Sequence, residues 1–157
     1  MKTIKVLTDF SETPGPRYIK QGPDSGELFY HQKLNGAFAE ALESDEQLQI
    51  DLDGTDGYMS SFLDEAIGNL VYDFGEELVQ HKLQIISNEE KIWIDLIKKN
   101  IIPEWGKRLK DKLPPQKTSK EGYTPWYRII DGQLERGIWA TTIRPYCVYP
   151  QIGCPFL

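Results

Sequence analysis

Residues 48–65, Leu48-Gln49-Ile50-Asp51-Leu52-Asp53-Gly54-Thr55-Asp56-Gly57-Tyr58-Met59-Ser60-Ser61-Phe62-Leu63-Asp64-Glu65, decide the fold. Apolar and polar residues alternate over 48–52, which predicts a strand with one buried face. Gly54 and Gly57 break this strand, and Ser60 or Ser61 is placed to cap the helix that follows. The stretch therefore predicts a strand that leads through a glycine-containing loop into a helix.

The chain on both sides continues this alternation of strands and helices. The pattern predicts strands at 4–7, 48–52 and 83–86, and helices at 25–44, 62–74 and 92–97. Ser25 is expected to cap the first helix, and Gly75 to stop the second. Residues 87–90 form a capping box for the third helix, and Pro103 is expected to end or kink it. The order predicts an α/β fold with a mixed or largely parallel sheet and helices packed on it.

Residues 114–157 differ in composition from the rest of the chain. Pro114 and Pro115 mark a boundary, so we expect an α/β domain over 1–113 and an extension over 114–157. Asp131-Gly132 is a strong turn signal and predicts a β-hairpin in the extension. We expect the extension to pack on its own domain, on a partner or on a second copy, because it holds too many aromatic residues for a free arm. These are Trp126, Tyr127, Trp139, Tyr146, Tyr149 and Phe156.

Composition and charge limit the classes of function. Hydrophobic residues make up 39% of the 157 residues and charged residues 27%, so the chain can bury a core. The net charge of −6 and the pI near 5.0 argue against a general nucleic-acid binder. We expect a cytoplasmic protein with no membrane span, because the sequence has neither a secretion signal nor an apolar run of about 20 residues.

The chain offers few ligands for a metal ion or a cofactor. Its cysteines are Cys147 and Cys154, and its histidines are His31 and His81. Neither histidine lies near the other or near the cysteines in sequence. We therefore expect free thiols, no metal site and no cofactor.

One interpretation of the loop is catalytic. Asp51-x-Asp53-Gly54-Thr55 has the letters of haloacid-dehalogenase-type phosphatases, in which one Asp attacks phosphate, a second acts as acid and base, and Mg²⁺ joins both. Those enzymes place the motif after the first buried strand, whereas here a strand and a helix precede it. The later acids that would complete a metal site fall on predicted helices or caps. The sequence therefore favours a protein that is not an enzyme, with an Mg²⁺-dependent phosphatase as the alternative.

Three separated motifs carry a resemblance to a known family. They are Pro14-Gly15-x-Arg17, Gly22-x-x-Ser25-Gly26-Glu27-x-Phe29, and Asp51-Leu52-Asp53-Gly54-Thr55-x-Gly57-Tyr58-x-Ser60-Ser61-Phe62-Leu63-x-Glu65-Ala66. Over about its first two thirds the chain resembles the STAS-like domain family of unknown function. The resemblance implies a STAS-type α/β fold and, more distantly, kinship with anti-anti-sigma factors.

The resemblance also implies a switch residue. In anti-anti-sigma factors a strand leads into a loop that ends Asp-Ser-Ser-Gly, and a partner kinase phosphorylates the first serine. Ser60 falls on that position, with Met59 in place of the acidic residue and Phe62 in place of the glycine. Ser60 and Ser61 are thus candidate phosphorylation sites, and the alternative is that they only cap the helix.

The two helix starts that follow the glycine-containing loops are expected to share one surface. We expect Arg17, Ser25, Asp53, Tyr58 and Ser60 to lie on it. Glu65 is either an inward residue paired with Arg17 or a surface acid matched to the helix dipole, and the surface position is favoured. The candidate partner-binding residues are Arg17, Ser25, Gly57, Tyr58, Phe62 and Glu65.

The sequence favours a non-enzymatic regulatory module that binds a protein partner. The resemblance implies a histidine-kinase-like ATPase as the first partner to test. A third interpretation is a structural subunit that forms a homo-oligomer through its aromatic extension.

Overall fold

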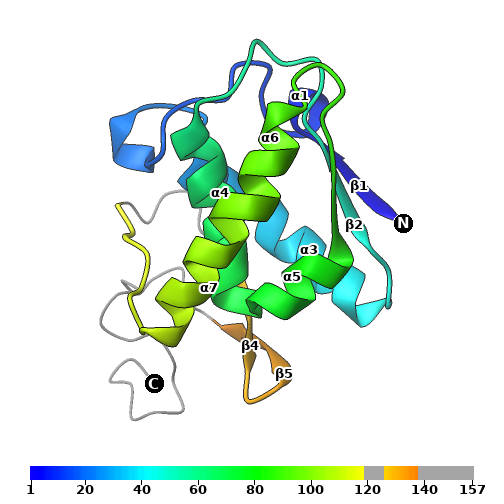
Figure 1. Ribbon diagram of the computed structural model, residues 1–157, viewed down its shortest axis with the longest axis vertical. Helices are drawn as coiled ribbons and strands as arrows, with labels where there is room; N and C mark the ends of the chain where they lie inside the picture. The colour runs from blue at the N-terminus through cyan, green and yellow to red at the C-terminus, as the bar shows by residue number, and fades with distance from the viewer. Residues whose placement is uncertain (119–125, 138–157) are drawn as a thin grey trace.

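The computed structural model describes residues 1–118 and 126–137 of the 157-residue chain (Figure 1). A three-stranded parallel sheet lies at its centre, with strands β1 (Lys2–Lys5), β2 (Leu48–Asp51) and β3 (Leu83–Ile86) in that order. Ile4 lies opposite Ile50, and Ile50 lies opposite Ile85. The parallel sheet with crossover helices confirms the predicted α/β fold.

The two faces of the sheet differ in polarity. Ile4, Leu48 and Ile50 are buried beneath the helices. The alternate residues are polar, and Thr3 Oγ1 donates to Gln49 Oε1 across 3.3 Å. Right-handed crossovers between consecutive parallel neighbours bring their helices to the same face. In Figure 1, α4 and α7 accordingly lie to one side of β1 and β2.

The helices fall into three groups along the chain. The first group is α1 (Val6–Asp9), η1 (Ile19–Gln21), α2 (Gly26–Phe29), the π-helical turn η2 (Tyr30–Leu34) and α3 (Asn35–Glu43). The second is α4 (Ser60–Phe74) and α5 (Glu76–Lys82). The third is α6 (Ile92–Asp95), the π-helical turn η3 (Leu96–Ile101) and α7 (Ile102–Lys110).

Helix α4 is the central helix, and α7 packs closely against it. Trp105 of α7 is buried against Gly68 of α4, where an added Cβ would lie 2.0 Å from the indole Cε2. The indole Nε1 donates to Asp64 Oδ1 across 3.0 Å. A glycine is therefore required at position 68 for α7 to reach this depth.

Two predicted boundaries differ from the structure. The first strand ends at Lys5, and Val6 begins α1, because the Lys5 N–H is held by Asp9 Oδ2 at 2.8 Å. Pro103 does not end the third helix. It lies in the first turn of α7, directly after η3, where Ile102 N–H bonds to Ile97 O, five residues back. The widened turn accommodates a proline, which lacks an N–H of its own.

A β-hairpin follows the helical part of the chain. Strands β4 (Trp126–Ile130) and β5 (Gln133–Gly137) pair antiparallel through Asp131 and Gly132, whose φ angles are 52° and 79°. The hairpin packs on the domain, because Asn35 Nδ2 donates to Tyr127 O and Tyr127 N donates to Asn35 Oδ1. The predicted turn is thus confirmed. Trp139, Tyr146, Tyr149 and Phe156 of the extension lie outside the described residues, as do both cysteines.

Candidate functional site

The loop between β2 and α4 is held in one conformation by its own hydrogen bonds. Tyr58 OH donates to Leu52 O across 2.7 Å, and Asp56 N donates to Glu12 O across 2.8 Å. Gly54 and Gly57 have φ angles of 92° and 129°, which side chains rarely tolerate. Burial raises the pKa of Tyr58 to about 12, so its hydroxyl stays a donor. The glycine-containing loop is therefore an ordered element of the site.

Neither serine at the end of this loop caps the helix. Helix α4 begins at Ser60, and the N-cap residue is the exposed Met59, whose carbonyl accepts from Phe62 N at 3.0 Å. The predicted serine cap is wrong, because the backbone turn of Met59 already places Ser60 inside the helix. Ser60 is exposed and Ser61 is half-buried.

Helices α6, η3 and α7 follow one another without a break and are called the α6–α7 rod below. Ser60 lies in an open depression of about 400 Å³ between α4 and this rod. The depression also contains Arg17, Asp64, Asn100 and Glu104, with Leu96 and Ile101. Arg17 Nη1 lies 2.5 Å from Asp64 Oδ2, while the other carboxylate oxygen of Asp64 accepts from Trp105. Asp64, a residue of α4, thus connects α4 both to the loop that contains Arg17 and to α7.

The predicted shared surface is only partly correct. Arg17 and Ser60 do line one depression. Ser25 is buried instead, and its Oγ accepts from Leu28 N at 3.0 Å, which confirms the predicted cap and contradicts a surface position. Phe62, expected to contact a partner, is buried in the core against Phe29.

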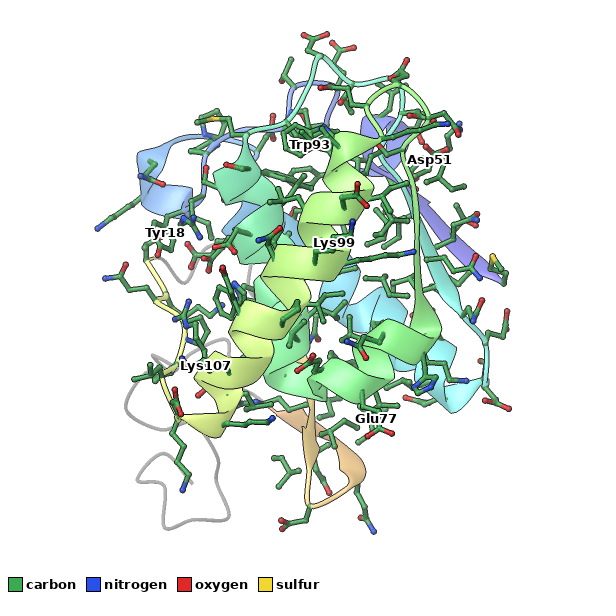
Figure 2. All side chains as sticks on the ribbon, viewed as in Figure 1. Tyr18, Asp51, Glu77, Trp93, Lys99 and Lys107 are labelled. Atoms are coloured by element: carbon green, nitrogen blue, oxygen red, sulfur yellow. The ribbon has the colours of Figure 1, made fainter. Side chains whose placement is uncertain are left out.

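Gly57 and Tyr58 are half-buried, and the Tyr58 ring contacts Trp93 edge-on. Figure 2 shows Trp93 and Asp51 toward the end of the molecule where this loop lies, and Tyr18 lower down on the left of the view.

The two aspartates of the phosphatase-like motif bond to the loops around them. Asp51 Oδ1 accepts from Asp53 N at 3.0 Å. Asp53 accepts from Asn88 Nδ2 and from Glu89 N, each at 3.0 Å, and so ties the loop after β2 to the loop after β3. Among residues 1–118 and 126–137, no group of three or more His, Cys, Asp or Glu side chains could hold a metal ion.

The capping box predicted at 87–90 does not form, because its hydrogen-bonding groups bond to other atoms. The Glu89 N–H donates to Asp53, which lies outside this segment. Ser87 Oγ donates to Glu90 O at 2.6 Å instead of accepting a hydrogen bond from the backbone. Helix α6 begins only at Ile92.

Glu65 is buried, so the favoured surface position is wrong. Its side chain points inward, with Oε1 3.5 Å from Arg17 Nη1 and Oε2 accepting from Asn69 Nδ2 at 2.7 Å. The inward alternative, in which Glu65 pairs with Arg17, is correct. Burial raises the pKa of Glu65, against the opposing effect of nearby Lys117 and Arg17.

A buried polar cluster around Glu65 was not predicted from the sequence. Lys117 Nζ donates to Asn69 Oδ1 at 2.7 Å and contacts His31 Nε2. Glu27 accepts from Thr118 N at 3.0 Å and from Ile19 N at 2.9 Å. Burial lowers the pKa of Lys117 to about 8. Glu27 and His31, like Glu65 and Asn69, are spaced four apart on apolar helix faces, which is the signal that could have revealed the cluster.

A comparison with models of protein families finds a match to part of this chain. Residues 25–93 match the family model described as a STAS-like domain of unknown function (DUF4325). No curated protein and no solved structure matches the chain. The resemblance found from the motifs is thus confirmed over 25–93, and Arg17 lies before the matched segment. Within the described residues, every helix is too short or too polar to traverse a lipid bilayer.

Proposed function

We propose that this chain is a non-enzymatic protein-interaction module whose binding surface is switched by phosphorylation of Ser60, and the match of residues 25–93 to the STAS-like family supports the first part of this proposal. The observation that carries the proposal is the position of Ser60. It is exposed, it is the first residue of the fifteen-residue helix α4, and it shares a depression with a cation, Arg17.

The start of α4 suits a phosphate group. The first N–H groups of a helix have no partner inside the helix, and the helix dipole is positive at this end. A phosphoserine adds a charge of about −1.5 to −2 at neutral pH. In the transfer step the Ser60 Oγ–phosphorus bond forms, the bond between the γ-phosphorus of ATP and its bridging oxygen breaks, and the hydroxyl proton passes to a base of the kinase.

The added charge acts on the Arg17–Asp64 pair. Residues four apart on a helix are neighbours, so a phosphate on Ser60 lies beside the Asp64 carboxylate and repels it. The same phosphate attracts Arg17, which now lies 2.5 Å from Asp64. Asp64 also holds Trp105, so the exchange of partners changes both the charge of the depression and the contact between α4 and α7.

The nature of the partner follows from the resemblance to anti-anti-sigma factors. We propose a histidine-kinase-like ATPase that binds the face around the depression and phosphorylates Ser60. Asp51 and Asp53 support a function without catalysis, because their carboxylates already accept backbone and side-chain hydrogen bonds within the loops.

The test uses the purified full chain and purified histidine-kinase-like ATPases from the same organism. The chain is incubated with each ATPase and Mg·ATP, and the modified residue is mapped by mass spectrometry. We expect modification of Ser60 and none in Ser60→Ala, with Ser61→Ala as the matched control that is still modified. Calorimetry should show binding by Ser60→Ala and at least tenfold weaker binding by Ser60→Asp.

Equal binding by the two Ser60 variants would remove this residue from the mechanism. Hydrolysis of a generic phosphate ester by the chain, abolished by Asp51→Asn, would overturn the non-enzymatic proposal.

A further inference from the structure

Strand β3 has one edge that no other strand of the described residues covers. Among the described residues it pairs with β2 alone. Ile86 O accepts from Leu52 N at 2.8 Å, so the backbone groups of Ile86 and Gln84 point toward β2. Those of Leu83 and Ile85 therefore point away from the sheet. The Leu83 N–H is used by the last turn of α5, where it bonds to Val79 O, which leaves the N–H and C=O of Ile85 at the centre of the edge.

The two edges of the sheet differ in charge. Strand β1, at the other edge, has the sequence Lys-Thr-Ile-Lys, and lysines on an edge strand discourage pairing with another chain. Strand β3 has the sequence Leu-Gln-Ile-Ile and carries no charge. Gln84, Ile85 and Ile86 are each half-buried. The edge at β3 thus lacks the protection that the edge at β1 has.

An apolar pocket lies beside this unprotected edge. It has a volume of about 270 Å³ and lies between α5, β3 and the η3–α7 rod. Leu83, Ile85, Ile97 and Ile102 contribute to its wall, together with Lys98. In Figure 1, β3 is the green strand that connects α5 to the loop before α6. The pocket lies on the helix side of β3, the side toward which Leu83 and Ile85 point.

We propose that two copies of this protein pair antiparallel along β3, about a two-fold axis at Ile85, and form one six-stranded sheet. Outward-pointing residues must face outward-pointing residues, which fixes the register. Ile85 lies opposite Ile85 of the second copy, Leu83 lies opposite Ser87, and Gln84 lies opposite Ile86. The Ile85 side chain of each copy then lies on the helix side, beside the apolar pocket of the other.

Charge favours a second copy of this chain at the β3 edge over an extended segment of another protein. The acidic pair Glu89–Glu90 follows β3, and Lys98 lies by the pocket beside the strand. An antiparallel two-fold brings the acidic turn of each copy toward the cationic side of the other, twice per dimer. Two-fold pairs of identical surfaces are the commonest arrangement of soluble oligomers.

The first experiment measures the mass of the full chain by sedimentation equilibrium between about 1 and 200 µM, a range that covers a small interface of about four backbone hydrogen bonds. We expect a concentration-dependent shift toward twice the 18.1 kDa of the chain. Ile85→Lys should shift the dissociation constant upward at least tenfold. The control is Gln49→Lys on the central strand, which adds the same charge on the polar face of the sheet and leaves the mass shift unchanged.

The second experiment tests the register without disturbing the edge. In a background with Cys147→Ser and Cys154→Ser, Ile85→Cys is oxidised under mild conditions. Directly opposed residues of a hydrogen-bonded antiparallel pair have Cα atoms about 5.5 Å apart, which a disulfide can span. We expect a covalent dimer with Ile85→Cys and none with the matched control Gln49→Cys.

Two outcomes would overturn the proposal. One is a monomer at every concentration, which would mean that any occupant of the edge is a different protein. The other is a dimer that Ile85→Cys does not cross-link, which would place the contact on another surface.

Discussion

The contact between Gly68 and Trp105 predicts a large effect from a single methyl group. In Gly68→Ala the new Cβ would lie 2.0 Å from Trp105 Cε2 and 2.3 Å from Nε1, whereas ordinary contacts begin near 3.4 Å. To lengthen the 2.0 Å approach at Cε2 to an ordinary contact of 3.4 Å, the indole must move away by about 1.4 Å. Such a movement stretches the 3.0 Å bond from Trp105 Nε1 to Asp64 beyond hydrogen-bond length.

The expected cost combines three effects. Overpacking of a filled core costs about 1–3 kcal/mol, and the lost hydrogen bond about 1 kcal/mol. Alanine recovers about 1 kcal/mol, because it favours a helix interior over glycine. We therefore expect the free energy of unfolding to fall by about 2 kcal/mol. With a urea dependence of about 2 kcal/mol per molar, the midpoint of unfolding should fall by about 1 M.

Urea titration followed by tryptophan fluorescence measures this change. Gly36→Ala is the matched control, because a Cβ at Gly36 in α3 meets nothing within 4 Å, and its midpoint should stay equal or rise. Combining Gly68→Ala with Trp105→Leu should cost less than the sum of the single variants, because the smaller side chain removes the clash. An unchanged or higher midpoint in Gly68→Ala would refute the close packing of α7 on α4.

Two further predictions concern the buried cluster and the loop after β2. Because the pKa of Lys117 is lowered to about 8 by burial, the folded chain loses this proton before the unfolded chain does. The Lys117 contribution to the free energy of unfolding should therefore rise between pH 8 and pH 10, by roughly 2–3 kcal/mol, before ionisation of Tyr58 begins to oppose it. Urea midpoints at each pH measure the rise; Lys117→Met should lack it, and an equal slope in both proteins would contradict the assignment. For the loop, Asp53→Ala should speed amide hydrogen exchange at residue 89, because the Glu89 N–H loses its acceptor, while exchange in α3 stays unchanged. Equal exchange at residue 89 in both proteins would show that Asp53 does not hold the two loops together.

Local patterns were sufficient for the second and third strands and for several helix ends. The strands at 48–52 and 83–86 were predicted because apolar residues recur at the spacing of a half-buried strand, and the structure places β2 and β3 there. Gly75 stops α4 as expected, with a φ of 94°. Val6 was assigned to the first strand because its apolar side chain suits either element. The Asp9 carboxylate, which turns the chain into α1, is not part of that pattern.

The candidate site was harder to predict, because its contacts join distant segments. Glu65 resembles a surface acid in its own helix, and its burial depends on Arg17 and Lys117, which lie far away in sequence. Ser60 and Ser61 are common cap residues, but a cap depends on backbone angles at Met59 that the residue types do not reveal. The role of Asp53 required knowledge that the loops after β2 and β3 are neighbours.

The buried cluster has a consequence for the order in which the protein folds on the ribosome. Glu27 takes hydrogen bonds from Thr118, and Glu65 lies in the field of Lys117. Until these late residues leave the exit tunnel, the nascent chain holds two acids at positions that the folded protein buries, with only some of the groups that compensate them, such as Ile19 N–H for Glu27 and Arg17 for Glu65. The earlier part of the chain, including the matched segment 25–93, should thus remain loosely packed during synthesis. Stable packing should follow within the time needed to translate a few tens of codons past α7.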